Sequence, residues 1–338
     1  MNPGPWLVTG AAGFIGAAVS RALLEAGERV VAVDSFNAYY DPALKRARVG
    51  RLEECKNFDF YRLDLTDGAG TGELFARHRP STVVHLAAQP GIARSLTDPM
   101  AYIQNNVVAT MNVLEACRHA AVGHLVYASS SSVYGANSRL PFSVHDPVDH
   151  PVSLYAATKR SNELMAHTYS HQFGLPATGL RFFTVYGPWG RPDMAYYAFA
   201  GAMTRGEPIT IYGDGSQQRD FTFIDDIVEG VVEVARRPPV ADDSWTPEKA
   251  DPATSRAPFR LYNIGHGVQV TVNELIRCLE ELLGVRAVRD HQPARSADMP
   301  ATHAEVGDLQ EATGFRPRAS FEYGINKFAE WFLEYHNP

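Results

Sequence analysis

A short glycine-rich turn near the N-terminus constrains the fold of this chain more than any other feature. Gly10, Gly13 and Gly16 follow Trp6–Thr9, an apolar segment that predicts a buried strand, and open Ile15–Ala26, an amphipathic segment that predicts a helix. In such a unit the first glycine permits a tight turn, the second lets the backbone approach a pyrophosphate, and the third allows close packing of helix on strand. The N–H groups of the helix N-terminus then attract phosphate oxygens. The turn therefore predicts a dinucleotide site.

A carboxylate at the end of the second predicted strand indicates which dinucleotide binds. Asp34 ends the strand-like segment Arg29–Asp34 and lies 18 residues beyond Gly16. A carboxylate there accepts hydrogen bonds from a ribose 2′-hydroxyl and repels a 2′-phosphate, which favours NAD over NADP. Further cofactor contacts are expected in the turn and after the third and fourth strands, at Phe14, Ile15, Asp64, Leu65, Ala87 and Ala88.

Strand-like and helical segments alternate along the first half of the chain. Further strands are predicted over Phe58–Arg62, Thr82–Leu86, His124–Ser129 and Ala177–Phe183, and helices over Tyr102–His119 and Tyr155–Phe173. Buried β-branched strands that alternate with helices form a parallel sheet with both faces covered. We therefore expect an α/β fold with a Rossmann-type doubly wound parallel sheet.

Past about residue 185, glycine, proline and aromatic residues interrupt the pattern. Regular structure returns in a predicted strand and two predicted helices, at Leu261–Ile264, Val272–Leu283 and Ser320–His336. Residues 237–258 are rich in Pro, Asp and Ser and predict a mobile surface insertion. We assign residues 1–183 to an NAD-binding domain, to which some later segments return. Residues 184–338 mainly form a smaller C-terminal α/β substrate-binding domain.

Composition excludes several functional classes. The 38 Asp and Glu against 31 Lys and Arg give a net charge of −7, which argues against nucleic-acid binding. No apolar run approaches the ~18–20 residues that a membrane span needs, and the N-terminus lacks the pattern of a signal peptide. The three cysteines are far apart and provide neither a disulfide framework nor a metal site. His167 and His171 lack a third metal ligand. We expect a cytoplasmic protein without a membrane or metal partner.

A tyrosine and a lysine four residues apart form the candidate catalytic pair. Tyr155 and Lys159 share one face of a predicted helix, where the lysine charge lowers the pKa of the phenol from about 10. A phenolate tuned in this way can take a proton from a sugar hydroxyl. Ser130, in the run Ser129–Ser132 after the fifth strand, can supply a hydroxyl to the same oxygen.

Together these motifs resemble the extended short-chain dehydrogenase/reductase family, specifically its nucleotide-sugar branch. The glycine turn, the serines before Val133-Tyr134-Gly135, and Tyr155 with Lys159 carry the resemblance, which extends from Leu7 to about Trp331. It implies a catalytic triad of Ser130, Tyr155 and Lys159, the last two also contacting the cofactor. It further implies that Asn106 helps to hold NAD. A homodimer through the helices 102–119 and 155–173 is expected as well.

The same resemblance implies a UDP site in the second half. Tyr212 is expected beside the uracil, and Arg219 and Arg295 on the diphosphate. Planar guanidinium groups with several donors match phosphate oxygens. For each arginine a solvated surface charge is the alternative.

The residues after Ser130 indicate the reaction. Ser131 and Ser132 stand where 4,6-dehydratases have an Asp-Glu pair and where glucuronate decarboxylases have a glutamate. Both serines are expected to contact the sugar. The remaining reaction is 4-epimerisation, in which bound NAD⁺ oxidises C4, the 4-keto sugar rotates, and hydride returns to its other face.

The segments around Thr184 and Arg191 resemble UDP-glucuronate 4-epimerases, which interconvert UDP-glucuronate and UDP-galacturonate. Thr184 and Arg191 are the candidates for the C6 carboxylate, with Arg94 as a third, and capping of a loop carbonyl is the alternative for Arg191. The alternatives in function are a 4-epimerase of UDP-glucose or UDP-N-acetylglucosamine, a UDP-glucuronate decarboxylase, and an inactive NAD(P)-binding sensor.

Overall fold

Seven parallel strands form the main sheet of the computed structural model, which describes residues 4–294 and 299–336. In spatial order they are β10 (Phe259–Ile264), β6 (Ala177–Phe182), β5 (His124–Ser130), β4 (Thr82–His85), β1 (Trp6–Thr9), β2 (Val30–Asp34) and β3 (Phe58–Arg62). The chain reverses its direction of winding between β1 and β4, and ligands of open α/β sheets bind at such a switch point. The predicted Rossmann-type fold is therefore confirmed, and β1 and β3 have the predicted bounds.

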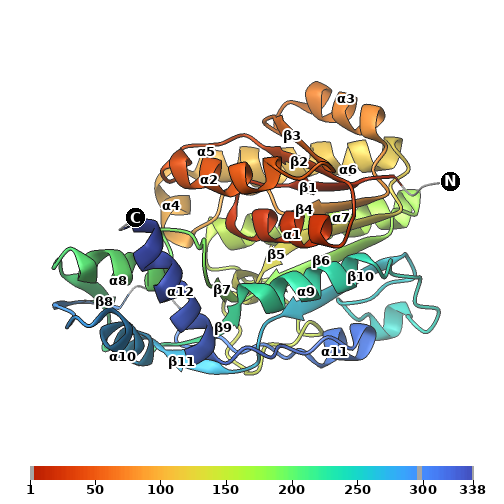
Figure 1. Ribbon diagram of the computed structural model, residues 1–338. Coiled ribbons are helices and arrows are strands. Elements are labelled where there is room, and N and C mark those ends of the chain that lie inside the picture. Colours follow the sequence, from red (N-terminus) through yellow and green to blue (C-terminus); the bar gives the residue numbers. More distant parts are fainter. Residues whose placement is uncertain (1–3, 295–298, 337–338) are drawn as a thin grey trace.

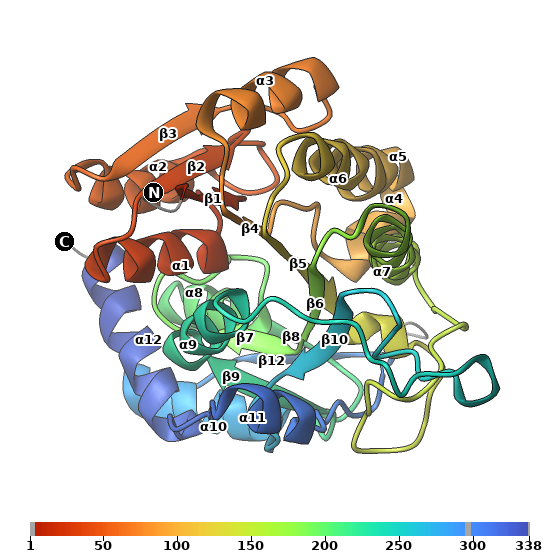
Figure 2. The ribbon, with the colours of Figure 1, turned by 90° about the vertical axis from the view of Figure 1, so that its right-hand side faces the viewer.

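Helices cover both faces of this sheet (Figures 1 and 2). On one face lie α1 (Phe14–Glu25) and α9 (Ile224–Ala235), and on the other lie α3 (Gly68–His78), α6 (Ala109–His119) and α7 (Leu154–Phe173). The inner strands such as β1 and β2 are thereby buried on both faces, as their apolar sequences require, whereas β3 at the edge is only partly buried. Within the described parts of the chain, no helix combines the length and apolar character needed to cross a membrane.

The predicted helix 102–119 is interrupted in the structure. After α4 (Ile92–Thr97) and α5 (Pro99–Tyr102), a π-helical turn occupies Ile103–Val108 before α6 begins. Single π-helical turns of this kind occur often at functional sites, since they displace one side chain from the regular helical pattern. A hydrophobic pattern does not reveal such a turn, so the uninterrupted helix was wrong.

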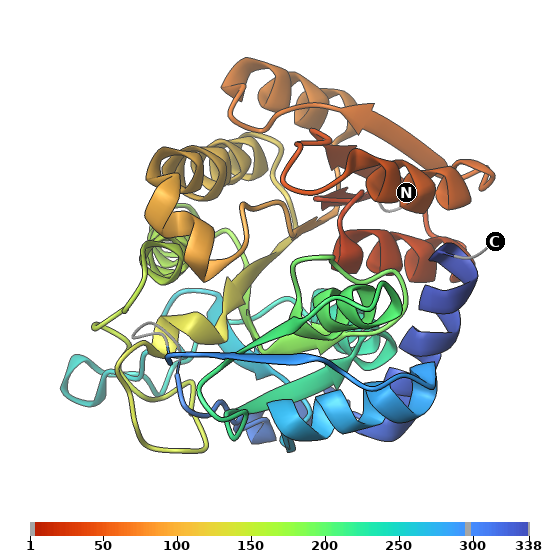
Figure 3. The ribbon, with the colours of Figure 1, turned by 90° about the vertical axis from the view of Figure 1, so that its left-hand side faces the viewer.

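A smaller second unit lies below the main sheet, where Figure 3 shows the blue C-terminal elements beneath the red and orange N-terminal ones. It contains a three-stranded sheet, β11-β9-β7, and a pair, β12-β8. Its strands are β7 (Thr184–Tyr186), β8 (Ile209–Tyr212), β9 (Gln218–Phe223), β11 (Gln269–Thr271) and β12 (Arg289–Gln292). Its helices are α8 (Ala195–Thr204), α10 (Val272–Leu283) and α12 (Phe321–His336), whereas α11 (Gly307–Thr313) contacts β10 and α9. Of the later elements, β10 joins the main sheet and α9 packs against α1.

The segment 237–258 is only partly a surface insertion. Its first half is largely exposed, but Ala253, Ser255 and Ala257 are buried. His167 on α7 contacts the Ser255 hydroxyl through Nε2 at 2.9 Å and packs edge-on against the Phe259 ring. The prediction of a mobile surface insertion was wrong for the last part of the segment, because the small residues there are buried beside β10. Among the described residues, no group of three His, Cys, Asp or Glu side chains is arranged to hold a metal.

Candidate active site

One cavity of about 1130 Å³ is lined both by residues predicted to bind the cofactor and by residues predicted to act on or bind the substrate. Its wall includes the predicted cofactor residues Gly10, Gly13, Phe14, Ile15, Gly16, Asp34, Asp64, Leu65, Ala87 and Ala88. It also includes Ser130, Tyr155 and Lys159 and the predicted substrate residues Arg94, Ser131, Ser132, Thr184, Arg191 and Arg219. A typical small-molecule site measures roughly 300–1,000 Å³. This cavity is therefore slightly larger than a typical site for one small molecule.

The glycine turn fits a dinucleotide because it leaves no space for side chains. Gly10 has φ +68°, and a Cβ there would lie 2.7 Å from the backbone nitrogen of Ala87. A Cβ on Gly16 would lie 2.2 Å from the carbonyl oxygen of Gly10. The N-cap of α1 is Gly13, and no side chain caps this end or places an acid in the first turn. The positive end of the helix is thus left for a ligand anion.

Asp34 is held rigidly at the end of β2. One carboxylate oxygen accepts the N–H of Ala12 at 3.1 Å, and the other accepts the N–H of Phe36 at 2.8 Å. Each oxygen of an ionised carboxylate has a second acceptor site. Asp34 can therefore accept ribose hydroxyls without moving, which is what NAD requires.

Asn106 does not line the cavity, contrary to its expected role as a cofactor contact. It lies in the π-helical turn, where it is fully buried. Its Oδ1 accepts the N–H of Gln89 at 2.7 Å, and its Nδ2 donates to the Gln89 carbonyl at 3.1 Å and to Thr158 Oγ1 at 3.0 Å. These bonds occupy the amide, so Asn106 supports the segment after β4 and links it to α7. Its neighbour Asn105 is the residue at the cavity wall.

The predicted catalytic residues converge from β5 and α7. Ser153 caps α7 by accepting the N–H of Ala156 at 3.2 Å, so Tyr155 and Lys159 lie in the first two turns. Ser130 ends β5 and forms a hydrogen bond with the Tyr155 hydroxyl. All three side chains reach the same region of the cavity.

The electrostatics of Tyr155 differ from the expectation. Burial raises the pKa of its hydroxyl, while the hydrogen bond from Ser130 and the charge of Arg191 lower it. Lys159 is buried, and burial lowers the pKa of its ammonium to about 8. Arg191, which sequence reasoning placed only at the substrate carboxylate, is thus the cation that acts on the catalytic phenol.

Arg191 comes from the loop after β7. It forms a side-on ion pair with Asp193, with Nε 3.0 Å from Oδ1 and Nη2 2.7 Å from Oδ2. Thr184 begins β7 and lines the same cavity. Arg94, on α4, lies over the ring of Tyr39 with its guanidinium carbon 5.2 Å from the ring centre. Asp193 and Tyr39 are cavity residues that sequence reasoning missed.

The sequence profile of the NAD dependent epimerase/dehydratase family matches residues 6–245. The chain belongs to this family. The predicted resemblance to nucleotide-sugar enzymes of this kind is thereby confirmed. The Tyr155–Lys159 pair and the glycine turn, on which that prediction rested, lie in the matched region.

Several known proteins resemble the family member described here over nearly its whole length. An uncharacterized 37.6 kDa protein of Escherichia coli is 49% identical and covers 98% of this chain and 99% of its own. A probable UDP-glucuronate 4-epimerase of Rhizobium meliloti is 44% identical, covering 97% and 96%. The solved structure of UDP-glucuronic acid 4-epimerase from Bacillus cereus, in complex with UDP-glucuronic acid and NAD, superposes with a TM-score of 0.87. It is 32% identical and covers 98% of this chain and 99% of its own.

The expected UDP residues of this family member are not all at the cavity. Arg219, on β9, lines it and donates to the carbonyl of Gln218 at 2.8 Å. Tyr212 ends β8 and does not contribute to the wall. Arg295 lies outside the described residues.

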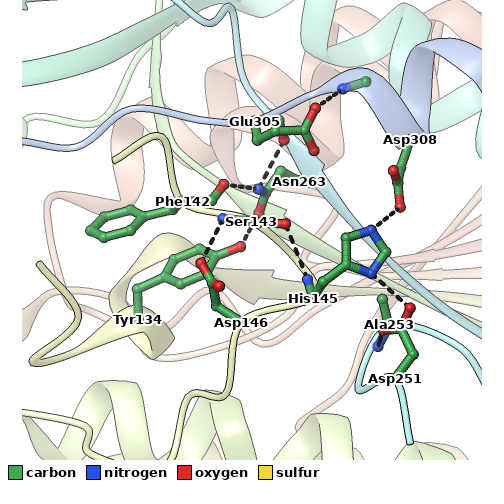
Figure 4. Close-up of polar contacts among 11 residues, drawn as sticks. Tyr134, Phe142, Ser143, His145, Asp146, Asp251, Ala253, Asn263, Glu305 and Asp308 are labelled. Atoms are coloured by element: carbon green, nitrogen blue, oxygen red, sulfur yellow. Dashed lines mark hydrogen bonds and ion pairs between the residues drawn. The ribbon is translucent and has the colours of Figure 1, made fainter. Parts of the chain in front are cut away.

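A polar network beside the 3₁₀ turn that follows Ser130 was also missed (Figure 4). The Tyr134 hydroxyl donates to Asn263 Oδ1 at 2.6 Å, and Asn263 Nδ2 donates to the carbonyls of Phe142 and Glu305 at 2.8 and 2.9 Å. Tyr134 closes the 3₁₀ turn Ser131–Tyr134, which begins with the two cavity serines. The network therefore connects that turn to the C-terminal segment. Its members are far apart in sequence, so no local pattern indicates it.

Proposed function

We propose that this chain is a UDP-glucuronate 4-epimerase, which binds NAD and interconverts UDP-glucuronate and UDP-galacturonate. The observation that carries the proposal is the place of Arg191, whose charge acts on Tyr155 inside the cavity that Thr184 also lines. A cation this close to the catalytic phenol suits a hexose whose C6 bears a carboxylate. Relatives named UDP-glucuronate 4-epimerase, at 43–44% identity over almost the whole chain, support the same substrate.

In this proposal the cofactor extends along the carboxyl ends of β1, β2 and β4. The glycine turn and the N-terminus of α1 hold the pyrophosphate, and Asp34 holds the adenosine ribose. Asp64 and Leu65 line the adenine end, while Ala87 and Ala88 leave space for the nicotinamide ribose. NAD⁺ supplies the group that takes a hydride from C4 and returns it.

The catalytic triad moves the proton. Tyr155 accepts the proton of the C4 hydroxyl at its phenolic oxygen as the ketone forms. Ser130 bonds the same sugar oxygen, and the charge of Arg191 favours the deprotonated phenol, while Lys159 holds the start of α7 against β5 through the Ala128 carbonyl. After the keto sugar has turned, Tyr155 returns the proton to the oxygen on the opposite face. Each residue is therefore used in both directions of the reaction.

The remaining residues hold the substrate. The 4-keto intermediate is a β-keto acid, which loses CO₂ when its C5–carboxylate bond aligns with the ketone π-system. Thr184 and Arg191, with Ser131, Ser132 and Arg94 nearby, hold the carboxylate out of that alignment. Arg219 and Arg295 bind the diphosphate while the sugar rotates.

The organisation of the protein follows from these roles. Residues 1–183 hold the cofactor and residues 184–338 mainly hold the UDP sugar, with β10 and α9 returning to the first unit. Two copies pair through α6 and α7, and the exposed apolar side chains of Met111, Leu164 and Phe173 on those helices support this pairing. The three cysteines are free, which suits the reducing cytoplasm.

The experiment is to incubate the purified protein with UDP-glucuronate and to separate the nucleotide sugars by chromatography. We expect UDP-galacturonate without net accumulation of NADH, both with and without added NAD⁺. UDP-glucose and UDP-N-acetylglucosamine are assayed in parallel. Turnover of either of these without turnover of UDP-glucuronate would contradict the substrate, and a UDP-pentose as the main product would contradict the reaction.

A further inference from the structure

Asp193 fixes the direction of the Arg191 guanidinium. The two groups share two parallel hydrogen bonds, 2.7 and 3.0 Å long, and this geometry sets the plane of the guanidinium as well as its position. Both side chains are about a quarter exposed and line the cavity. The negative charge of Asp193 therefore lies beside the group that we assign to the substrate carboxylate.

Tyr39 ties this ion pair to the cofactor side of the cavity. Its hydroxyl donates to Asp193 Oδ2 at 3.2 Å across 154 residues of sequence. Tyr39 belongs to the loop after β2 that also places Ser35 and Asn37 in the wall, directly after Asp34. A change in the position of that loop is thereby transmitted to the Asp193 carboxylate.

Arg48, on α2 (Pro42–Glu53), fixes the backbone of the Arg191 loop to the glycine turn. It is only 2% exposed. Its Nε and Nη2 donate to the Trp189 carbonyl at 3.0 and 2.7 Å, and Nη2 also reaches the Gly190 carbonyl at 2.9 Å. Its Nη1 donates to the carbonyl of Ala12 at 3.1 Å. The buried Arg48 side chain thus forms hydrogen bonds both with the glycine turn and with the two residues that precede Arg191.

We propose that Arg48, Tyr39 and Asp193, here called the support residues, position Arg191 relative to the cofactor and thereby decide between epimerisation and loss of CO₂. The inference rests on the proposed function, because it concerns the fate of the carboxylated 4-keto sugar. In decarboxylation the bond from C5 to the carboxyl carbon breaks, and its electron pair enters the C4 ketone as an enolate. CO₂ leaves, and C5 takes a proton from water, which gives a 4-keto pentose. The hydride that was taken from C4 in the first step would then return to C4 to give the UDP-pentose. This step needs no further oxidant.

The geometry explains why an arginine alone does not suffice. A long side chain in an open cavity can follow a carboxylate through many orientations, including the one that aligns the C5–carboxylate bond with the ketone. A site that holds a substrate in one orientation needs binding groups that their own packing and hydrogen bonds keep within about 0.5 Å of the required position. Asp193 restricts the guanidinium, and Arg48 restricts the loop that bears it.

Asp193 also affects the pKa of Tyr155, which a residue with a purely structural role would not do. Its charge raises the pKa of the Tyr155 hydroxyl, whereas Arg191 lowers it. The other groups that face this phenol are Ser130 at the end of β5, Lys159 on the same helix, and Tyr102 of α5, whose ring centre is 6.1 Å away. None of these three groups changes in an Asp193→Asn variant, so the acid limb of the kcat profile reports the loss of the Asp193 charge together with the release of Arg191.

The test compares Asp193→Asn and Tyr39→Phe with the wild-type holoenzyme on UDP-glucuronate. For Asp193→Asn we expect the ratio of UDP-pentose to UDP-galacturonate to rise about tenfold, because the guanidinium loses its fixed plane. The acid limb of kcat should move to lower pH. For Tyr39→Phe we expect a smaller rise of about threefold with an unmoved limb, because no charge is removed. Glu207→Gln, which opens the exposed side-on pair with Arg205, is the matched control and should change neither measurement.

The outcomes distinguish a failure of the proposed function from a failure of the role proposed for the support residues. A wild-type protein that makes no UDP-galacturonate overturns the proposed function and the inference with it. If the wild type is active and the Asp193→Asn variant keeps the product ratio and the pH profile of the wild type, the proposed role of the support residues is wrong and the proposed function stands. Arg48→Lys, which keeps the charge but not the planar set of donors, provides a second arm. An unchanged product ratio in this variant, with a wild-type thermal transition, counts against the proposal as well.

Discussion

The ammonium of Lys159 donates to the carbonyl of Ala128 at 2.9 Å, which joins the second turn of α7 to the strand that ends in Ser130. Lys159 is almost fully buried, whereas Ala128 is partly buried and lines the cavity. A buried cation without an anionic partner in this bond costs stability, and part of that cost is relieved when the group loses its proton. The catalytic position of Lys159 therefore implies a measurable pH dependence of folding.

We predict that the protein becomes more stable as the pH rises above 8. Burial lowers the pKa of Lys159 to about 8 from an ordinary value of 10.5, so between these values the unfolded chain binds a proton that the folded protein has lost. Stability rises with pH wherever the unfolded state binds more protons, and the gain here is on the order of 3 kcal/mol. Urea unfolding at pH 7.5, 9 and 10 measures it. Lys159→Met should lack the rise and should lose about 10²-fold in kcat. An equal rise in both proteins would assign it to other groups.

The glycine turn should tolerate no methyl group at its third glycine. A Cβ on Gly16 would lie 2.2 Å from the Gly10 carbonyl oxygen, so Gly16→Ala must displace the turn that faces the pyrophosphate. We expect a loss of more than about 1 kcal/mol in stability and a much weaker affinity for NAD⁺ in calorimetric titration. Gly50→Ala is the matched control, because Gly50 lies in α2 and nothing lies within 4 Å of its added Cβ. That variant should gain up to about 1 kcal/mol.

His145 should make the surface loop after the catalytic serines dependent on pH. Its Nδ1 lies 2.7 Å from Asp251 and its Nε2 lies 3.0 Å from Asp308, and these carboxylates raise its pKa (Figure 4). A raised pKa gives stabilisation that is fully present below about pH 6.5 and is lost as the pH rises through the folded value. The melting temperature of wild type minus that of His145→Gln should therefore shrink between pH 5.5 and 8. A difference that is constant with pH would show that the imidazole contributes only neutral contacts.

Local patterns were sufficient to predict the main sheet and many, but not most, of the residues in the cavity wall. The glycine turn, Asp34 and the Tyr155–Lys159 pair each combine a residue type with a spacing that the chemistry demands, and all line one cavity. Long-range hydrogen bonds were beyond such reasoning. Arg48 stands among other basic residues on a polar helix and was indistinguishable in sequence from a solvated charge.

The same limit explains why the buried position of Asn106 and the interruption of the helix before α6 were not foreseen. Whether an amide faces a ligand or the protein depends on one extra residue in a helical turn, and a π-helical turn leaves no mark on hydrophobic periodicity. The bond between Tyr39 and Asp193 joins two loops that are 154 residues apart. Only the packing of the second unit against the first brings them together.

The buried ion pair of Glu163 and Arg181 gives the last prediction. Arg181 on β6 donates through Nε and Nη2 to the two oxygens of Glu163 at 2.9 and 3.0 Å, and Ser129 donates to the same carboxylate at 2.6 Å. Both charged side chains are fully buried, and Arg181 holds the pKa of Glu163 below its ordinary value. Glu163→Gln keeps the shape but leaves the arginine charge without its counterion, which costs about 3–5 kcal/mol.

The measurement is the free energy of unfolding in urea, with Glu25→Gln as the control. Glu25 pairs with Arg21 on the surface of α1, with both side chains more than half exposed, so its removal should cost no more than about 1 kcal/mol. Similar losses in the two variants would show that the buried pair contributes no more than an exposed one.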